Sequence, residues 1–371
     1  MAVLDRISIA GYRSICRLQF KLRRLNVVCG PNGSGKSNLY KALRLLSRTA
    51  QGGLPKAIAQ EGGMPSILWA GAKKKGSVRL VLAAYSDRFN YEVSLGLPPP
   101  CSAAFPTDPE VKEEFVWQGQ PRRKGTTYFE RSTSGAWVMD RNGERVSYCG
   151  NLDSAEPVLA QLREPHLYPE LSILGRDLQE WRFYDYFRTD PESPLRQPQP
   201  SVRTPILAHD GIDLAAALET IRQVGDAATL EESIQAVFPG SSLYVQQEGC
   251  LFWLELKMPG IQRCLRAPEF SDGTVRYLCL LAALLSPVPA PLLILNEPEN
   301  SLHSDVLVPL AKLIRRASER SQVWVTTHSH RLAGLLSEDP EAKVMTLHKV
   351  EGETRILGQG LILEDSPELR A

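Results

Sequence analysis

The chain has 371 residues, 43% of them hydrophobic, so it can bury one large core or two moderate ones. With 43 Lys and Arg against 42 Asp and Glu, the net charge of +1 gives no global attraction to nucleic acid, anionic membrane or acidic partner. Prolines interrupt the most apolar stretch, residues 278–295, and Asp5 and Arg6 stand where a signal-peptide core would begin. Seven cysteines without a Cys-x-x-Cys pair fit neither a disulfide framework nor a zinc knuckle, so we expect a cytoplasmic protein that does not enter a membrane.

Three strands are predicted at the start of the chain. Residues 4–10 and 16–22 alternate polar and apolar side chains, and residues 25–29 form a shorter, more apolar run. A glycine-rich segment at 30–37 follows the third strand and precedes a helical pattern that begins near Leu39. The order strand, glycine-rich loop, helix is therefore expected here.

The middle of the chain is expected to form an antiparallel β-rich insertion followed by helices. From about residue 78 to 149, short alternating runs are separated by turn signals, including an Asn-Gly pair at 142–143. Residues 157–187 and 212–238 have helical patterns. The proline-rich segment 191–200 predicts an extended loop, because proline fixes φ and disfavours helix just before it.

The last third of the chain alternates strands and helices. The expected elements are strands at 243–247 and 251–258, a helix from Gly273, a wholly apolar strand at 292–295, a helix from Ser304 and a strand at 323–326. Such alternation is typical of a parallel sheet covered on both faces, and it places the chain in the α/β class.

The segment 30–37 matches the phosphate-loop pattern G-x-x-x-x-G-K-[ST] in the strand, loop, helix context that this pattern requires. In such a loop, backbone N–H groups surround the β-phosphate, Lys36 neutralises β and γ oxygens, and Ser37 can ligate Mg²⁺. A glycine-rich turn followed by an exposed lysine is the alternative. The predicted nucleotide-binding residues are Asn32, Gly33, Ser34, Gly35, Lys36, Ser37 and Asn38.

Four further segments follow in an informative order. Residues 270–274, Phe-Ser-Asp-Gly-Thr, precede an apolar helix, and residues 292–298 end an apolar strand with Asn-Glu-Pro. Residues 301–303, Ser-Leu-His, come next, and residues 323–329 end a second strand with Thr-His-Ser. In this order the segments resemble the signature, Walker B, D-loop and switch-histidine motifs of ATP-binding-cassette (ABC) ATPases.

The interval between Lys36 and the signature segment is far longer than in a transporter nucleotide-binding domain. With the opening Gly-Tyr-Arg-Ser-Ile at 11–15 and Asn-Glu-Pro-Glu-Asn-Ser-Leu-His at 296–303, the chain resembles SMC-like, RecF-type AAA ATPases. The resemblance is specific over residues 1–50 and 262–371 and loose over the middle.

The resemblance implies a fold and a domain organisation. The expected fold is a P-loop ABC-type ATPase head with a parallel or mixed sheet core and an inserted antiparallel-β and helical lobe. The nucleotide-binding core would be discontinuous, formed by residues 1–70 and 260–371, and the inserted lobe would comprise residues 77–259.

The resemblance also implies roles for individual residues. It places Ser271 and Gly273 across a two-fold dimer, so that each nucleotide would lie between Lys36 of one protomer and Ser271 of the other. Glu297 would orient or deprotonate the attacking water, and His328 would contact the γ-phosphate. Both are therefore the candidate catalytic residues.

Three assignments stay open at this level. Arg13 lies where relatives use an arginine beside the nucleotide, and a surface ion pair is the alternative. Asn296 stands where Walker B ordinarily has an aspartate that holds Mg²⁺. Its amide oxygen can accept from a metal-bound water without supplying charge, or Glu297 takes the metal role. The glutamine that relatives place in a loop between two lobes has three candidates, Gln60, Gln161 and Gln179.

The leading interpretation is an ATP- and Mg²⁺-dependent switch that dimerises on ATP, hydrolyses it slowly, and acts on DNA or a DNA-acting partner in repair or phage defence. One alternative is a regulatory ATPase of a defence or toxin system that controls a separate effector protein. A transporter nucleotide-binding subunit is disfavoured by the β-rich insertion. The basic runs 73–75 and 122–124 are candidate phosphate contacts or solvated turns.

Overall fold

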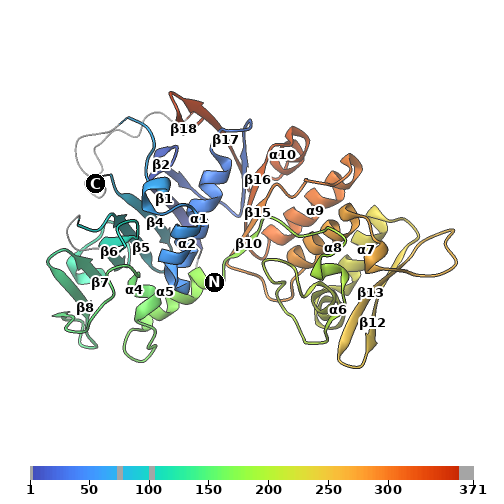
Figure 1. Cartoon of the computed structure of the whole chain (residues 1–371), viewed down its shortest axis with the longest axis horizontal. Coiled ribbons are helices and arrows are strands. Elements are labelled where there is room, and N and C mark those ends of the chain that lie inside the picture. Colours follow the sequence, from blue (N-terminus) through green and yellow to red (C-terminus); the bar gives the residue numbers. More distant parts are fainter. Residues whose placement is uncertain (1–2, 73–77, 100–104, 359–371) are drawn as a thin grey trace. The chain divides into compact units, whose positions relative to one another are not determined.

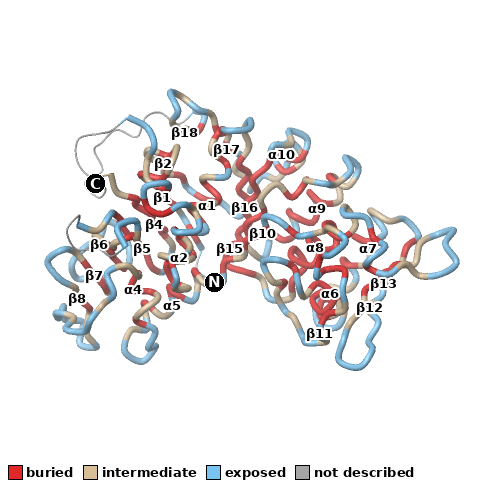
Figure 2. The backbone as a smooth tube through the Cα atoms, viewed as in Figure 1, coloured by how far each residue is buried: buried red, intermediate tan, exposed pale blue. Residues whose placement is uncertain are grey.

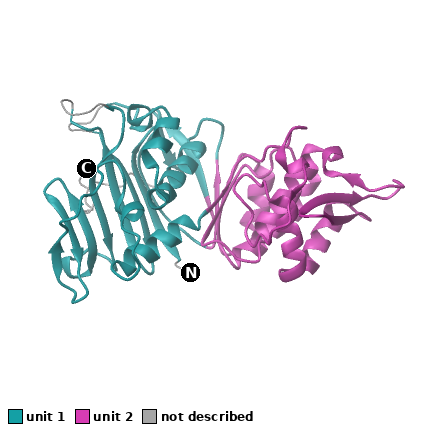
Figure 3. Cartoon of the chain, turned by 60° about the horizontal axis from the view of Figure 1, so that its bottom comes forward, with its two compact units in different colours: residues 1–23, 30–181, 345–371 teal, residues 24–29, 182–344 magenta. Residues whose placement is uncertain are grey.

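Figure 1 shows the helices and strands of the computed structural model, which describes residues 3–72, 78–99 and 105–358. The chain divides into two compact units (Figure 3). Unit 1 consists of residues 1–23, 30–181 and 345–371, and unit 2 of residues 24–29 and 182–344. Residues of the predicted nucleotide-binding core and of the predicted inserted lobe occur in both units. The predicted division into core and lobe, which is based on motifs, therefore stays a prediction.

Unit 1 is built on an antiparallel sheet of order β2-β1-β4-β5-β6-β7-β8-β9 within the described residues. Its strands are β1 (Leu4–Tyr12), β2 (Ile15–Lys21), β4 (Leu80–Ser86), β5 (Asn90–Gly96), β6 (Glu110–Trp117), β7 (Thr127–Ser132), β8 (Gly135–Met139) and β9 (Arg145–Ser147). The first two predicted strands are confirmed as a hairpin, and the predicted insertion strands extend the same sheet. The Asn142-Gly143 turn joins β8 to β9 as expected.

Helices cover this sheet. They are α1 (Lys36–Gln51), α2 (Leu54–Gln60), α3 (Met64–Ile67), α4 (Val158–Gln161) and α5 (Pro169–Gln179), with the 3₁₀ turn η1 (Lys124–Thr126). Helix α1 packs against β1 and β4 because Leu39, Leu43 and Leu46 recur every three or four residues on its buried face. Strands β17 (Ala342–Val350) and β18 (Glu353–Ile356) form an antiparallel hairpin, and β18 lies near β2.

Unit 2 contains four parallel strands in the order β10-β15-β16-β3. They are β10 (Arg182–Tyr184), β15 (Leu292–Asn296), β16 (Gln322–Thr327) and β3 (Leu25–Cys29). All six residues of β16 are buried, and β15 is buried except at Asn296 (Figure 2). Such continuous burial is typical of strands covered on both faces, and the parallel pairings confirm the predicted parallel sheet.

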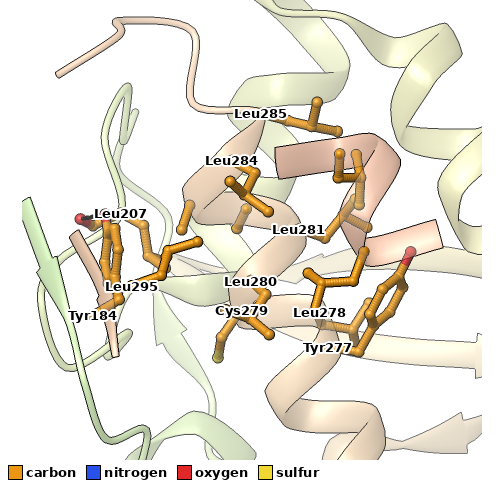
Figure 4. Packing of buried hydrophobic residues seen from close by; sticks show 14 of the residues in the cluster. Tyr184, Leu207, Tyr277, Leu278, Cys279, Leu280, Leu281, Leu284, Leu285 and Leu295 are labelled. Atoms are coloured by element: carbon orange, nitrogen blue, oxygen red, sulfur yellow. Dashed lines mark hydrogen bonds between the residues drawn. The ribbon is translucent and has the colours of Figure 1, made fainter. Parts of the chain in front are cut away.

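The rest of unit 2 packs around this sheet. Its remaining strands are β11 (Gln199–Pro200), β12 (Ser242–Glu248), β13 (Leu251–Lys257) and β14 (Leu265–Arg266). Its helices are α6 (Leu214–Val224), α7 (Ala227–Val237), α8 (Asp272–Leu284), α9 (Leu307–Ser318) and α10 (His330–Ser337), with 3₁₀ turns η2 (Pro194–Arg196), η3 (Ala267–Glu269) and η4 (Ser304–Val306). Helix α8 is buried on nearly all sides from Val275 onward (Figure 4).

One predicted helix is wrong in part. Residues 157–187 do not form a continuous helical region, because α4 and α5 are short and the segment ends in strand β10. A run of three residues is too short to give a period, so its pairing with β15, not its local pattern, makes β10 a strand. Tyr184 lies directly beside Leu295 in this pairing (Figure 4).

A buried carboxyl group joins the sheet of unit 1 to the start of α4. Glu114 in β6 is fully buried and accepts hydrogen bonds from the Tyr91 hydroxyl at 2.6 Å and from the Val158 backbone N–H at 2.9 Å. The Arg131 guanidinium lies 3.9 Å away. Burial raises the pKa of Glu114 from 4.5 to about 7, although Tyr91, Val158 and Arg131 all act to lower it.

This raised pKa predicts a pH-dependent stability. Between pH 4.5 and 7 the unfolded chain binds fewer protons at Glu114 than the folded chain, so the free energy of unfolding falls as pH rises, by about 3 kcal/mol in total. The Glu114→Gln variant should lose this component. Urea denaturation of both proteins at pH 5 and pH 8 measures it, and equal pH dependence in the two would contradict the assignment.

Candidate functional site

The phosphate loop lies in unit 1, between β3 and α1. Gly35 is the residue before α1 and has φ of 109°, in the region that favours glycine. A side chain at Gly35 would also collide with Thr354. The loop can therefore keep this shape only with glycine at position 35.

The Lys36 side chain forms hydrogen bonds to the backbone at the start of the phosphate loop. Its Nζ donates to the backbone carbonyls of Gly30 at 2.7 Å and Pro31 at 3.2 Å. No ion pair in the described part of the chain neutralises Lys36, and the buried hydroxyl of Ser34 has no hydrogen-bond partner there. An ammonium and an unpaired donor beside a helix N-terminus suit an anionic phosphate.

The other predicted nucleotide-binding residues differ in exposure and contacts. Asn32, Gly33 and Ser37 are exposed at its surface. Asn38 Nδ2 donates to Ser14 Oγ at 2.8 Å, which ties the start of α1 to the β1–β2 turn.

Arg13 lies in that turn and pairs with Glu61, with 2.7 Å between its NH2 atom and Glu61 Oε2. The Tyr12 hydroxyl donates to the same oxygen at 2.7 Å. The structure thus shows an ion pair for Arg13, and its contact with the nucleotide stays a prediction.

The carboxyl ends of the parallel strands in unit 2 carry the other predicted residues. Asn296 ends β15, Glu297 follows it directly, and His328 follows β16; Asp185, which the sequence did not predict, follows β10. The fourth strand, β3, leads directly into the phosphate loop at Gly30. In parallel α/β sheets this edge is where ligands bind.

Glu297 is held by its backbone in an unusual conformation. Its φ is +48°, its N–H donates to the Thr326 carbonyl at 2.7 Å, and its carbonyl accepts from Arg276 at 2.9 Å. Burial lowers the pKa of the Arg276 guanidinium. Asn300 donates to Glu297 Oε2 at 2.9 Å, so the carboxylate is fixed through one oxygen. A residue outside its preferred φ region is often found at a functional site.

A second carboxylate, Glu299, positions His328. Glu299 is buried, and its Oε1 accepts from the Thr327 hydroxyl, the His328 N–H at 3.0 Å and the Ser329 N–H at 3.2 Å. The His328 Nδ1 atom lies 3.4 Å from Glu299 Oε1 and 3.8 Å from Glu297 Oε1. The two predicted catalytic side chains are therefore neighbours. The sequence analysis missed Glu299, because its role depends on the strand beside it.

Asn296 contacts a carboxylate that the sequence analysis did not identify. Its Nδ2 donates to Asp185 Oδ1 at 2.6 Å. Asp185 follows the strand that was predicted as helix, so no sequence pattern pointed to it. Within the described residues no group of three or more His, Cys, Asp and Glu side chains forms a metal cluster, so metal binding here requires amide, hydroxyl or water oxygens as well.

The signature segment begins helix α8. Ser271 is its N-cap, accepting from the Thr274 N–H at 3.2 Å, and its side chain is exposed. A Cβ atom at Gly273 would lie 2.9 Å from the Ser301 carbonyl, so glycine allows the D-loop segment to approach α8 closely. The structure thus places Gly273 of the predicted signature segment next to Ser301 of the predicted D-loop.

A buried arginine holds this segment in place. The Arg196 side chain is 4% exposed and donates to the carbonyls of Ala267 and Phe270 and to Asp272 Oδ1 at 2.7 Å. It also donates to the Thr189 carbonyl at 2.8 Å. Arg196 lies in the segment predicted as a proline-rich loop, and only the tertiary structure reveals its role.

The remaining candidates are the two basic runs and the glutamines considered for the loop between the lobes. The basic run 73–75 lies outside the described residues. In the second run, the Arg122 guanidinium lies 3.6 Å from the centre of the Phe115 ring. Gln161 and Gln179 donate to the carbonyls of Glu156 and Ala50, both at 2.6 Å.

Comparison with known proteins identifies the fold. Residues 25–333 match a protein family described as "AAA domain, putative AbiEii toxin, Type IV TA system". No curated protein matches the chain.

Among solved structures, the chain is similar to an Smc head bound to the C-winged helix domain of ScpA, with 15% identity, a TM-score of 0.55, and coverage of 97% of this chain and 98% of that one. It is similar to an Smc head with an extended coiled coil, bound to the C-terminal domain of ScpA and derived from Pyrococcus furiosus, with 13% identity, a TM-score of 0.51 and 96% coverage of both. An Smc head with a coiled coil and joint from Pyrococcus yayanosii gives 12% identity, a TM-score of 0.51 and coverage of 97% and 98%.

These similarities confirm the predicted P-loop ABC-type ATPase head. Among the described residues, no helix is both long enough and apolar enough to cross a membrane.

Proposed function

Since the chain belongs to the family of AAA domains described as "AAA domain, putative AbiEii toxin, Type IV TA system", and has the fold of SMC-like ATPase heads, we propose that it binds and slowly hydrolyses ATP as a dimer that forms on ATP. The observation that carries the proposal is the pair Glu297 and His328, whose side chains lie 3.8 Å apart at the ends of neighbouring parallel strands. The next strand, β3, leads into the phosphate loop.

Each residue has a role in this proposal. Lys36 neutralises the nucleotide phosphates, and Glu297 accepts a proton from the attacking water. His328, oriented by Glu299, donates a hydrogen bond toward the γ-phosphate. Ser37 and Asn296 are the residues proposed to hold Mg²⁺, which when bound would supply Lewis-acid stabilisation of the phosphate oxygens.

The exposed signature segment supports the proposed dimer. Ser271 presents its hydroxyl and the N-terminus of α8 to solvent, and a helix N-terminus favours an anion. In the proposed dimer this anion is the nucleotide bound by the partner protomer. Arg196 keeps the segment in place before the partner arrives.

Two downstream functions remain candidates. In the first, the dimer acts on DNA or on a DNA-acting partner, as expected from the resemblance to RecF-type ATPases. In the second, it regulates a separate effector protein of a toxin or defence system, a function that the description of the matching family favours. The two differ in whether DNA changes the ATPase rate.

A complementation experiment tests the dimer and distinguishes these functions. Neither Lys36→Ala nor Ser271→Arg should hydrolyse ATP alone, but their heterodimer retains one complete site. Random pairing of equal amounts should restore about a quarter of the wild-type rate, since half of the dimers are heterodimers with one active site. The rates are measured with and without duplex DNA.

Stimulation by DNA supports the first function, and an unchanged rate supports the second. No recovery, with heterodimers demonstrated by light scattering or cross-linking, would contradict a site completed by the partner.

A further inference from the structure

Strand pairing brings an amide and a carboxylate together at one edge of unit 2. In the parallel pair β10 and β15, Tyr184 is opposite Leu295. Asp185 and Asn296 are the next residues of the two strands, and their side chains meet at 2.6 Å. The contact therefore follows from the register of the sheet.

The hydrogen bond orients both side chains. Asn296 donates through Nδ2, so its amide oxygen takes no part in this contact. Asp185 accepts through Oδ1, which leaves Oδ2 for another partner. In the part of the chain that the structure describes, no other hydrogen bond or ion pair engages either side chain. Two hard oxygen atoms thus remain for a ligand.

We propose that Asp185 and Asn296 together form the divalent-cation site of this chain, in which Asp185 supplies the negative charge and Asn296 supplies an amide oxygen. Mg²⁺ binds such oxygens, directly or through its water molecules. The inference rests on the proposed ATPase function. In this site Asp185, at the end of the neighbouring strand, carries the negative charge that the Walker B aspartate ordinarily carries at position 296.

This site also resolves the alternative role for Glu297. Asn300 donates a hydrogen bond to Oε2 of Glu297, and Oε1 of the same carboxylate lies near His328 Nδ1. With the cation held by Asp185, Glu297 stays available to accept a proton from water. The two carboxylates then have separate tasks at the ends of adjacent strands.

Substitutions at Asp185 and Asn296 have predictable effects on the charge of the proposed cation site. Asp185→Asn removes the only carboxylate of the pair. Asn296→Asp alone places two carboxylates in direct contact, where like charges repel unless a cation or proton lies between them. The double exchange Asp185→Asn with Asn296→Asp restores one carboxylate and one amide, and with them the charge and the hydrogen bond.

The test is a Mn²⁺ titration of the full chain followed by electron paramagnetic resonance, with a saturating non-hydrolysable ATP analogue. We expect Asp185→Asn to weaken Mn²⁺ affinity by about tenfold or more, and the double exchange to restore most of it. Asp339→Asn serves as the control and should bind Mn²⁺ as the wild type does, because Asp339 lies beyond the C-terminal end of α10.

Affinity for a fluorescent ATP analogue in EDTA is measured on the same proteins. Wild-type protein that binds the analogue neither in EDTA nor with Mn²⁺ contradicts the proposed function. Intact nucleotide binding with unchanged Mn²⁺ affinity in Asp185→Asn overturns the cation site alone. Should Asp185→Asn fail to fold, the double exchange decides, because a folded protein with one carboxylate and weak Mn²⁺ binding overturns the proposal.

Discussion

Replacing Lys36 with alanine is expected to weaken ATP binding by about 100-fold or more, which corresponds to about 3 kcal/mol. Lys36 Nζ lies over the carbonyls of Gly30 and Pro31 and is the cation that the phosphate loop offers to the β and γ oxygens. Without it, backbone N–H groups face the phosphates with no full positive charge beside them. Isothermal titration calorimetry with ATP measures the loss.

A matched control lies on the same helix. Lys41 belongs to α1 but is outside the loop, so Lys41→Ala should retain ATP affinity while making the same change of residue type. Circular dichroism of both variants verifies that α1 is intact. Equal affinities in Lys36→Ala and the wild type would remove the basis for a nucleotide site in unit 1.

Replacing Glu297 with glutamine should slow hydrolysis by about 100-fold or more while leaving ATP affinity nearly unchanged. The amide can still accept the hydrogen bond from Asn300, so the local structure is retained. It cannot accept a proton from water, so ATP stays bound and the ATP-dependent dimer should persist. Single-turnover kinetics and light scattering in saturating ATP measure the two effects.

An exposed carboxylate elsewhere in unit 2 provides the comparison. Glu338 pairs with Arg315 on the surface, and Glu338→Gln should leave both the rate and the dimer as in the wild type. A Glu297→Gln protein that stays monomeric in saturating ATP would contradict ATP-driven dimerisation. One that hydrolyses ATP at the wild-type rate would contradict its role as the base.

The sequence predicts those parts of the site that local patterns encode. The glycines and the lysine of the phosphate loop are close together in the sequence. The motif can therefore be recognised from residues 30–37 alone. Glu297 and His328 end apolar strands, which makes their position at a sheet edge predictable. The same reasoning predicts the first strands of the chain and the parallel sheet.

The parts that sequence analysis missed depend on distant contacts. Asp185 becomes a partner of Asn296 only because a three-residue strand pairs with β15. Glu299 acquires its role from the backbone of β16, and Arg196 from carbonyls more than 70 residues further along the chain. None of these interactions has a period or a spacing that could be recognised before the chain is folded.

The buried guanidinium of Arg196 also connects two segments of unit 2 that are far apart in the sequence. It bonds to Thr189 on the peptide that leaves β10 and to Phe270 and Asp272 at the signature segment. Separating them would break hydrogen bonds to a charged group, each worth about 1.5–3 kcal/mol. Arg196 therefore ties the peptide that follows β10, four residues after Asp185, to the segment that carries Ser271.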